Sequence, residues 1–308
     1  MAKGSTRVVL AALAGNGAIA VAKFVAAAIS GSAAMLTEAI HSLVDTGDQL
    51  LLLLGQSRGR RPPDHTHPLG YGMETYFWSF IVALMVFVLG GVLSIYEGVR
   101  HILAPEPVLS PWLSLGVLAV AAVFEGFSFR VGYREYKRVV HGRPVRIWEF
   151  IRGSKDPSLV SVLLEDSAAL IGIVLAAVGV AASSLLHIAW ADGAASIAIG
   201  LLLTGVAFVL ANETRSLIAG ESVAPIVMDR LKETLAAIDC ITRLDEIATL
   251  HLGPGSILVA LTLSFRPNST TALIDDAIVE ITKCLQATDE RVAYVYVRLS
   301  HKGQRAAA

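Results

Sequence analysis

Four polar residues share one face of a segment that is otherwise apolar. Residues 33–54 carry, at helical positions i, i+4, i+8 and i+11, the side chains of Thr37, His41, Asp45 and Asp48. His41 and Asp45 are one helical turn apart, which brings their Cβ atoms to about 5–6 Å. An imidazole nitrogen and a carboxylate oxygen at that separation can chelate one divalent metal ion. The alternatives are a hydrogen bond between helices and a water-filled crevice.

A second pair of acids, Glu165 and Asp166, lies in another apolar segment. Zinc normally takes about four ligands, so His41 and Asp45 would need partners from elsewhere in the chain. Neighbouring residues of a helix point about 100° apart, so both acids can reach one ion only if their side chains converge. We expect Asp166 to be the firmer ligand and Glu165 to join it. The predicted metal site therefore consists of His41, Asp45, Glu165 and Asp166.

Other polar residues of the apolar segments have simpler explanations. A charged side chain at the centre of a membrane costs about 2.5–3.5 kcal/mol, so each one requires a partner or a function. For Asn16, Lys23 and Glu125 we favour hydrogen bonds between helices over a place along an ion path. Asp192 opens an apolar segment and is predicted to be its N-cap.

The elements that hold these residues are predicted from hydropathy. The chain of 308 residues is 54% hydrophobic and 17% charged, with a mean hydropathy of +0.62, whereas ordinary soluble domains are about 25% charged. A transmembrane helix needs about 20 mostly apolar residues. Six stretches meet this requirement, namely residues 8–29, 33–54, 76–101, 112–131, 159–186 and 188–210. We expect residues 1–212 to form an all-α bundle of six transmembrane helices.

The connections between these segments predict the orientation in the membrane. Lysine and arginine follow the second segment at Arg58, Arg60 and Arg61. They also follow the fourth at Arg134, Lys137, Arg138, Arg143, Arg146, Arg152 and Lys155. The turns near residues 31, 104–110 and 189 carry none. Because basic loops stay in the cytoplasm, both termini are predicted to be cytoplasmic, and we expect the inner (plasma) membrane of a bacterium.

Residues 213–308 return to the charge density of a soluble domain. Periodicity predicts a helix over 225–238, strands over 247–252 and 257–265, a helix capped by Ser269 or Thr270, and a last strand over 291–299. The order α-β-β-α-β predicts a small ferredoxin-like α+β domain of a kind used for homodimerisation. No nucleotide-binding glycine loop, nucleophile motif or cofactor signature is present, and a net charge of −1 argues against nucleic acid.

Three segments resemble the cation diffusion facilitator family, and the resemblance extends over nearly the whole chain. Residues 32–45, 67–74 and 163–169 read Ser-Ala-Ala-Met-Leu-Thr-Glu-Ala-Ile-His-Ser-Leu-Val-Asp, His-Pro-Leu-Gly-Tyr-Gly-Met-Glu and Leu-Leu-Glu-Asp-Ser-Ala-Ala. The last segment looks most like the branch of organellar zinc transporters and their bacterial relatives. The resemblance implies metal ligands at His41, Asp45 and Asp166. It also implies a ligand at position 162, which is Val162 here, so Glu165 or water must replace it.

The resemblance also bears on a second metal site in the loop before residue 73. Some members of the family bind zinc there through an aspartate and two histidines. Asp64 and His67 match that pattern, Tyr71 replaces the second histidine, and His65 could compensate. We expect no tight site in this loop. The C-terminal region lacks the clustered histidines of some members, with His251 alone near the hairpin, so we expect a homodimer that zinc does not bridge.

Together these features predict a secondary transporter rather than an enzyme. The expected function is efflux of a divalent cation, zinc first, in exchange for protons and with alternating access. Manganese, cobalt or ferrous iron are alternatives, because one imidazole with several carboxylates is a hard ligand set. An intramembrane metalloenzyme is disfavoured because no HExxH motif is present. A membrane-anchored metal sensor is the remaining alternative.

Overall fold

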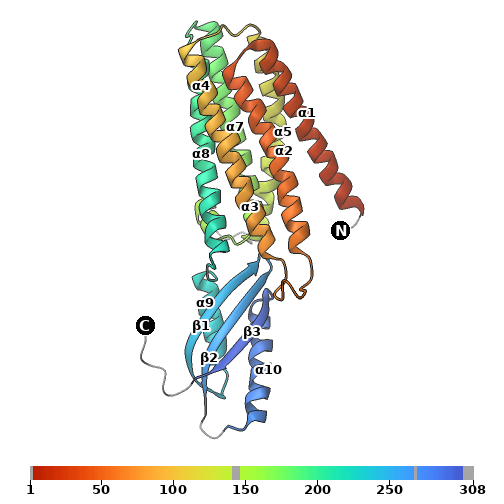
Figure 1. Cartoon of the computed structure of the whole chain (residues 1–308), viewed down its shortest axis with the longest axis vertical. Helices are drawn as coiled ribbons and strands as arrows, with labels where there is room; N and C mark the ends of the chain where they lie inside the picture. Colours follow the sequence, from red (N-terminus) through yellow and green to blue (C-terminus); the bar gives the residue numbers. More distant parts are fainter. Residues whose placement is uncertain (1–2, 141–145, 267–268, 301–308) are drawn as a thin grey trace. The chain divides into compact units, whose positions relative to one another are not determined.

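The chain folds into two compact units, each considered by itself. The computed structural model describes residues 3–140, 146–266 and 269–300, with side chains from residue 15 onward, so Arg143 lies outside the described residues. One unit comprises Met1–Gly55 with Phe77–Arg215, and the other Gln56–Tyr76 with Ser216–Ala308 (Figure 1). The second unit thus includes Gln56–Tyr76, whereas the sequence analysis places these residues in the helical bundle of residues 1–212. In that segment Gly72 lies so close to the backbone at Leu252 and Gly253 that no Cβ would fit.

Long helices build the first unit. In chain order they are α1 (Lys3–Ser30), α2 (Ala33–Gly59), α3 (Met73–Met85), α4 (Leu93–Leu103), α5 (Pro111–Val139), α7 (Pro157–Leu185) and α8 (Ala191–Ile218). The π-helical segment η1 (Val86–Val92) joins α3 to α4 without a break, and the short α6 (Ile147–Gly153) precedes α7. Gly31, with φ +68°, allows the tight turn from α1 to α2. Each of the six predicted segments corresponds to a helix, with α3, η1 and α4 acting as one.

Length and apolar composition mark four of the described helices as candidates to cross a membrane. They are the continuous helix Met73–Leu103, α5, α7 and α8. The described side chains of α1 give a shorter apolar stretch, Gly15–Ser30, and α2 carries Glu38, Asp45 and Asp48 among its 27 residues. The helical architecture of the first unit is therefore as expected, while the count of six spans stays a prediction.

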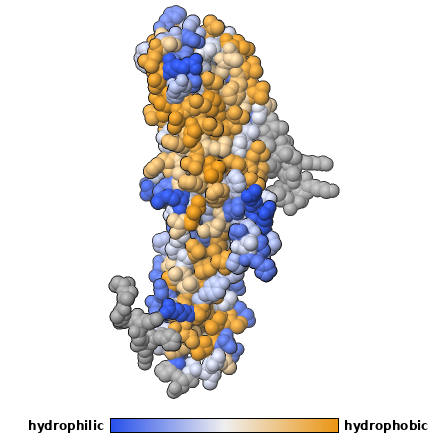
Figure 2. All heavy atoms as spheres, viewed as in Figure 1, coloured by the Kyte–Doolittle hydropathy of each residue, from blue (hydrophilic) through white to orange (hydrophobic). Residues whose placement is uncertain are grey.

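The surface of the first unit is apolar where a soluble protein would be polar. Figure 2 shows apolar residues over most of the helical unit on the face it draws. Large apolar side chains such as Val123, Phe127 and Phe208 are at least 70% exposed. Contiguous apolar surface of this extent requires a lipid or protein cover. The long helices satisfy their own backbone hydrogen bonds, as a bilayer demands.

Small residues let α8 approach the helix formed by α3, η1 and α4. A Cβ on Gly98 of α4 would stand 2.6 Å from the carbonyl oxygen of Gly193 in α8, and one on Gly200 would stand 2.8 Å from that of Gly91. Such contacts between backbones are typical of helix packing in membranes, where apolar burial alone gives little preference. They make this pair of helices one packed element.

Asp192 corrects one of our predictions. We expected it to cap its own helix, but it lies within the first turn of α8 and its carboxylate accepts hydrogen bonds from the first turn of α2. The backbone N–H groups at the start of any helix lack intrahelical acceptors. Here the acceptor comes from a helix 158 to 160 residues away in sequence, which no local pattern indicates.

The second unit contains α9 (Pro225–Ala236), β1 (Ile241–Gly253), β2 (Ser256–Phe265), α10 (Thr271–Thr288) and β3 (Val292–Leu299). This is the predicted α-β-β-α-β order. The sheet order is β1-β2-β3, with β1 antiparallel and β3 parallel to β2. Alternate residues of β2 pack with Leu231 of α9 and Leu285 of α10 in one core. Thr270 caps α10 by accepting a hydrogen bond from the N–H of Leu273. The sequence predicted either Ser269 or Thr270 as this cap.

Candidate metal site

Three acids from two helices meet inside the first unit. Carboxylate oxygens of Asp45 and Asp48 on α2 and of Glu165 on α7 lie within 4.8 Å of one another. Asp48 is fully buried, Glu165 is 5% exposed, and Asp45 is partly buried. The two acids of α2 come together because they are three residues apart, which is almost one helical turn.

Several of these oxygens have no hydrogen-bond partner among the described residues. They are Asp45 Oδ1, both oxygens of Asp48, and Glu165 Oε1. Buried polar atoms are nearly always paired, so a cluster of unpaired carboxylate oxygens requires an explanation. A divalent cation would satisfy all of them at once, because anionic oxygens are good ligands for it.

His41 lies one turn before Asp45 and is almost completely buried, with 1% of its side chain exposed. Its Nδ1 is 3.4 Å from Asp45 Oδ1, and neither ring nitrogen has a hydrogen-bond partner among the described residues. The ring can therefore offer a nitrogen lone pair at the edge of the acidic cluster. The predicted proximity of His41 to Asp45 is present in the structure.

Asp166 is not part of this group of three acids. Its Oδ2 accepts a hydrogen bond of 2.8 Å from the hydroxyl of Ser128 on α5, and it is not among the grouped residues. Glu165 and Asp166 diverge because successive helical residues point about 100° apart. The geometry therefore favours Glu165, whereas the sequence analysis ranked Asp166 first. It also brings in Asp48, which shared the predicted face but was not in the predicted site.

A buried lysine lies beside this cluster. Lys23 of α1 donates hydrogen bonds to Glu38 Oε2 at 2.9 Å and to Ser42 Oγ at 2.7 Å, both on α2. Both members of the Lys23–Glu38 ion pair are completely buried. The expected hydrogen bonding of Lys23 between helices is confirmed. Since Glu38 precedes His41 by three residues, the pair lies within one turn of the candidate site.

The loop proposed as a second metal site uses its aspartate in another way. Asp64 Oδ1 accepts hydrogen bonds from the hydroxyl of Thr66 and from the N–H groups of Thr66 and His67, and Oδ2 accepts one from the Tyr71 hydroxyl at 2.7 Å. The ring of His67 packs on Tyr71 with centroids 4.0 Å apart. His65 is exposed. Asp64 therefore closes a turn, with Tyr71 as a partner, and the expectation of no tight metal site in this loop stays a prediction.

Tyr71→Phe tests this role of Asp64. The Tyr71 hydroxyl is the strongest of several hydrogen-bond donors that hold the pKa of Asp64 below its usual range. A lowered pKa stabilises the fold above pH about 4, the ordinary carboxyl value, and this contribution is lost as the pH falls. We expect Tyr71→Phe to raise the pKa of Asp64, measured by NMR titration of ¹³C-labelled aspartate. An unchanged pKa would show that Tyr71 does not hold this carboxylate.

Comparison with known proteins identifies the family of this chain. Residues 9–219 match the cation efflux transmembrane domain. The chain belongs to the cation efflux family. It is therefore an integral membrane protein of a transporter family, as the resemblance implied.

Named relatives of this cation efflux protein differ in their substrates. This chain is 35% identical over 256 residues to the human "Proton-coupled zinc antiporter SLC30A9, mitochondrial". The alignment covers 83% of this chain and 45% of the relative. It is 30% identical to "Metal tolerance protein C4" of Arabidopsis thaliana, over 77% of this chain and 52% of the relative. The chain thus spans about half the length of these two. It is 23% identical to the "Manganese efflux system protein MneP" of Bacillus subtilis, over 82% of each chain.

Proposed function

We propose that this cation efflux protein exports a divalent metal ion, zinc first, in exchange for protons. The observation that carries the proposal is the group of Asp45, Asp48 and Glu165, whose oxygens lie within 4.8 Å of one another between α2 and α7. A transported ion needs a site that binds it away from both surfaces and releases it again. His41 and Asp166 are the further candidate ligands from the sequence.

Proton exchange follows from the chemistry of these groups. Carboxylates bind a metal ion when ionised, and an imidazole binds it when neutral, so metal binding releases protons and protonation releases metal. Alternating exposure of the site to the two sides of the membrane then converts a proton gradient into metal export. The name of the human relative, a proton-coupled zinc antiporter, supports this choice.

Manganese is the second candidate substrate. Three carboxylates with one imidazole form an oxygen-rich donor set, which suits manganese better than a set dominated by nitrogen or sulfur. The Bacillus relative named for manganese efflux supports this alternative. We keep zinc first because the relatives with higher identity include the zinc antiporter. Competition between the two ions in one transport assay decides between them.

The proposal includes the topology and assembly predicted from the sequence. α1 and α2 join the four more apolar helices as spans, which gives six spans with both termini on the cytoplasmic side. The domain formed by α9, α10 and the three-stranded sheet mediates homodimerisation. A proton gradient must be present, as it would be in a bacterial plasma membrane. Light scattering of the purified protein in detergent measures the dimer.

The decisive experiment uses the purified full chain in proteoliposomes that contain a pH-sensitive dye and a zinc-sensitive dye. Zinc added outside should enter, and the lumen should become more alkaline because protons leave in exchange. Liposomes without protein are the control for leakage. Entry of zinc without a pH change in either compartment would contradict proton exchange. Zinc binding without any flux would favour the membrane-anchored sensor.

A further inference from the structure

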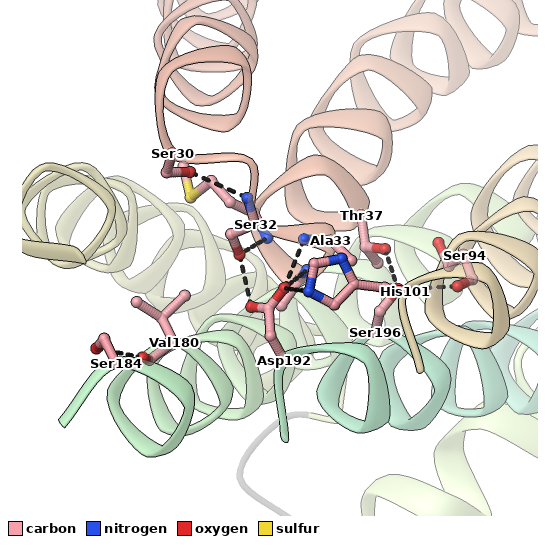
Figure 3. A network of polar contacts seen from close by, with 12 residues as sticks. Ser30, Ser32, Ala33, Thr37, Ser94, His101, Val180, Ser184, Asp192 and Ser196 are labelled. Carbon is pink, nitrogen blue, oxygen red and sulfur yellow. Dashed lines mark hydrogen bonds and ion pairs between the residues drawn. The ribbon is translucent and has the colours of Figure 1, made fainter. Parts of the chain in front are cut away.

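A polar network lies where the α1–α2 turn meets α4 and α8 (Figure 3). Asp192 Oδ1 accepts a hydrogen bond of 2.6 Å from the hydroxyl of Ser32, and Oδ2 accepts one of 2.5 Å from the N–H of Ala33. A longer one of 3.3 Å comes from the N–H of Ala34. The carboxylate therefore fastens the N-terminus of α2 to α8, and it is completely buried.

A second branch of the network reaches further along α2. The Ser196 hydroxyl of α8 donates to the carbonyl oxygen of Ser94 in α4 at 2.8 Å, and it lies 2.6 Å from the hydroxyl of Thr37 in α2. Since Ser196 uses its proton on Ser94, Thr37 is the donor to Ser196. α2, α4 and α8 are thus linked, and the link ends at Thr37, one helical turn before His41.

His101 of α4 stands beside this network without completing it. Its Nε2 lies 3.6 Å from Asp192 Oδ2, too far for a hydrogen bond. That nitrogen is buried and has no hydrogen-bond partner among the described residues, and the side chain is 8% exposed. With a proton on it, this buried nitrogen would be a donor to the neighbouring carboxylate.

A cavity of about 350 Å³ gives a proton access to His101. His101 lines it together with residues of α1, the α1–α2 turn and the start of the α4–α5 loop. The other charged residues in its lining are Glu97 and Arg100 of α4, which pair at 3.3 Å, and Glu106. α1 and α2 contribute only uncharged side chains to the lining. Asp192 is thus the acid that faces His101 from the packed interior.

We propose that His101 is a second proton-binding site, separate from the metal cluster, with Asp192 as its partner. The inference rests on the proposed exchange of metal for protons, which it deepens. When His101 binds a proton from the cavity, its Nε2–H donates to Asp192 and fastens α4 to α8 and to the first turn of α2. When the proton leaves, that fastening is lost while the bonds of Asp192 to α2 remain.

The fastening acts on the helix that holds the candidate metal ligands. Ala33 precedes His41 by eight residues, which is about 12 Å along a helix. A proton on His101 therefore favours the arrangement of α2 in this structure over one in which α2 and α4 separate. A hydrogen bond between charged groups changes such an equilibrium by about tenfold or more. Protons arriving at this end thus act on α2 without entering the metal site.

The first test measures unfolding of the purified, metal-free full chain in detergent at pH 5.5 and pH 8. His101→Gln keeps an amide donor but cannot gain a proton. We expect the stability advantage of the wild type over His101→Gln to be about tenfold larger in the unfolding constant at pH 5.5 than at pH 8. An equal advantage at both pH values would overturn the inference, whether or not the protein transports metal.

His187→Asn is the matched control for this test. His187 is exposed in the α7–α8 turn, and its φ of 56° suits asparagine. This variant removes an imidazole that has no described contact with Asp192. Its stability should follow the wild type at both pH values. A change as large as that of His101→Gln would show a general effect of histidine removal and would overturn the inference.

The second test measures zinc flux in proteoliposomes while the pH is changed on one side at a time. The wild-type rate should change about tenfold with the pH at the side that holds the cavity. This change in rate should be lost in His101→Gln. Asp192→Asn, whose amide oxygen can still accept a hydrogen bond from α2, should lose the same pH dependence of the rate. The double variant should lose no more of it than either single variant. Wild-type profiles in both variants would overturn the inference. No flux in the wild type would instead overturn the proposed function.

Discussion

Asp45→Ala in the full chain is expected to lower zinc transport at least about 100-fold. The reason is that Asp45 supplies one of three carboxylates that converge within 4.8 Å. Changes to groups that only support metal ligands already cost about 10–100-fold, and removal of a ligand costs more. The measurement is the initial rate of zinc entry into proteoliposomes, with zinc binding measured by calorimetry on the same samples.

Substitutions of the two acids of α7 test whether Glu165, as the structure indicates, or Asp166, as the sequence predicts, is the more important ligand. Glu165→Gln should reduce transport as strongly as Asp45→Ala, because Glu165 belongs to the cluster. Asp166→Asn should cost only about tenfold, because its carboxylate is engaged by Ser128 and an amide oxygen can accept the same hydrogen bond. Asp276→Asn on the exposed surface of α10 is the matched control. A larger loss in Asp166→Asn than in Glu165→Gln would refute the grouping.

Lys23→Met is expected to cause the largest loss of stability, about 3–5 kcal/mol in the free energy of unfolding. Lys23 and Glu38 are both completely buried and 2.9 Å apart. Removing the ammonium leaves the Glu38 carboxylate without its partner, and its other oxygen already faces Gly172 on α7 without a hydrogen bond among the described residues. Chemical unfolding of the detergent-solubilised protein measures the effect.

The double variant Lys23→Met/Glu38→Gln separates charge from packing. When both charges are removed, no uncompensated ion remains, and most of the lost stability should return. Lys232→Met on the exposed side of α9 is the control for replacing a lysine and should change stability by less than about 0.5 kcal/mol. If the double variant is as unstable as Lys23→Met, the pair does not stabilise the fold through its charges.

Several features could be determined from the sequence because they depend on local patterns. Each long apolar segment corresponds to a helix, because apolar length and the self-sufficient hydrogen bonding of helices need no partner. The face that joins His41 and Asp45 follows from the helical period alone. The alternation in 257–265 and the helical spacing in 225–238 predicted β2 and α9 for the same reason.

Tertiary structure decided what the side chains contact. Glu165 rather than Asp166 joins Asp45 and Asp48, because two adjacent residues point to different helices and only packing decides which helix lies where. Asp192 caps α2 and Lys23 pairs with Glu38 across long or moderate separations in sequence. Local periodicity determines the direction of a side chain around its own helix. The partner on the next helix depends on how the bundle assembles, which no single segment encodes.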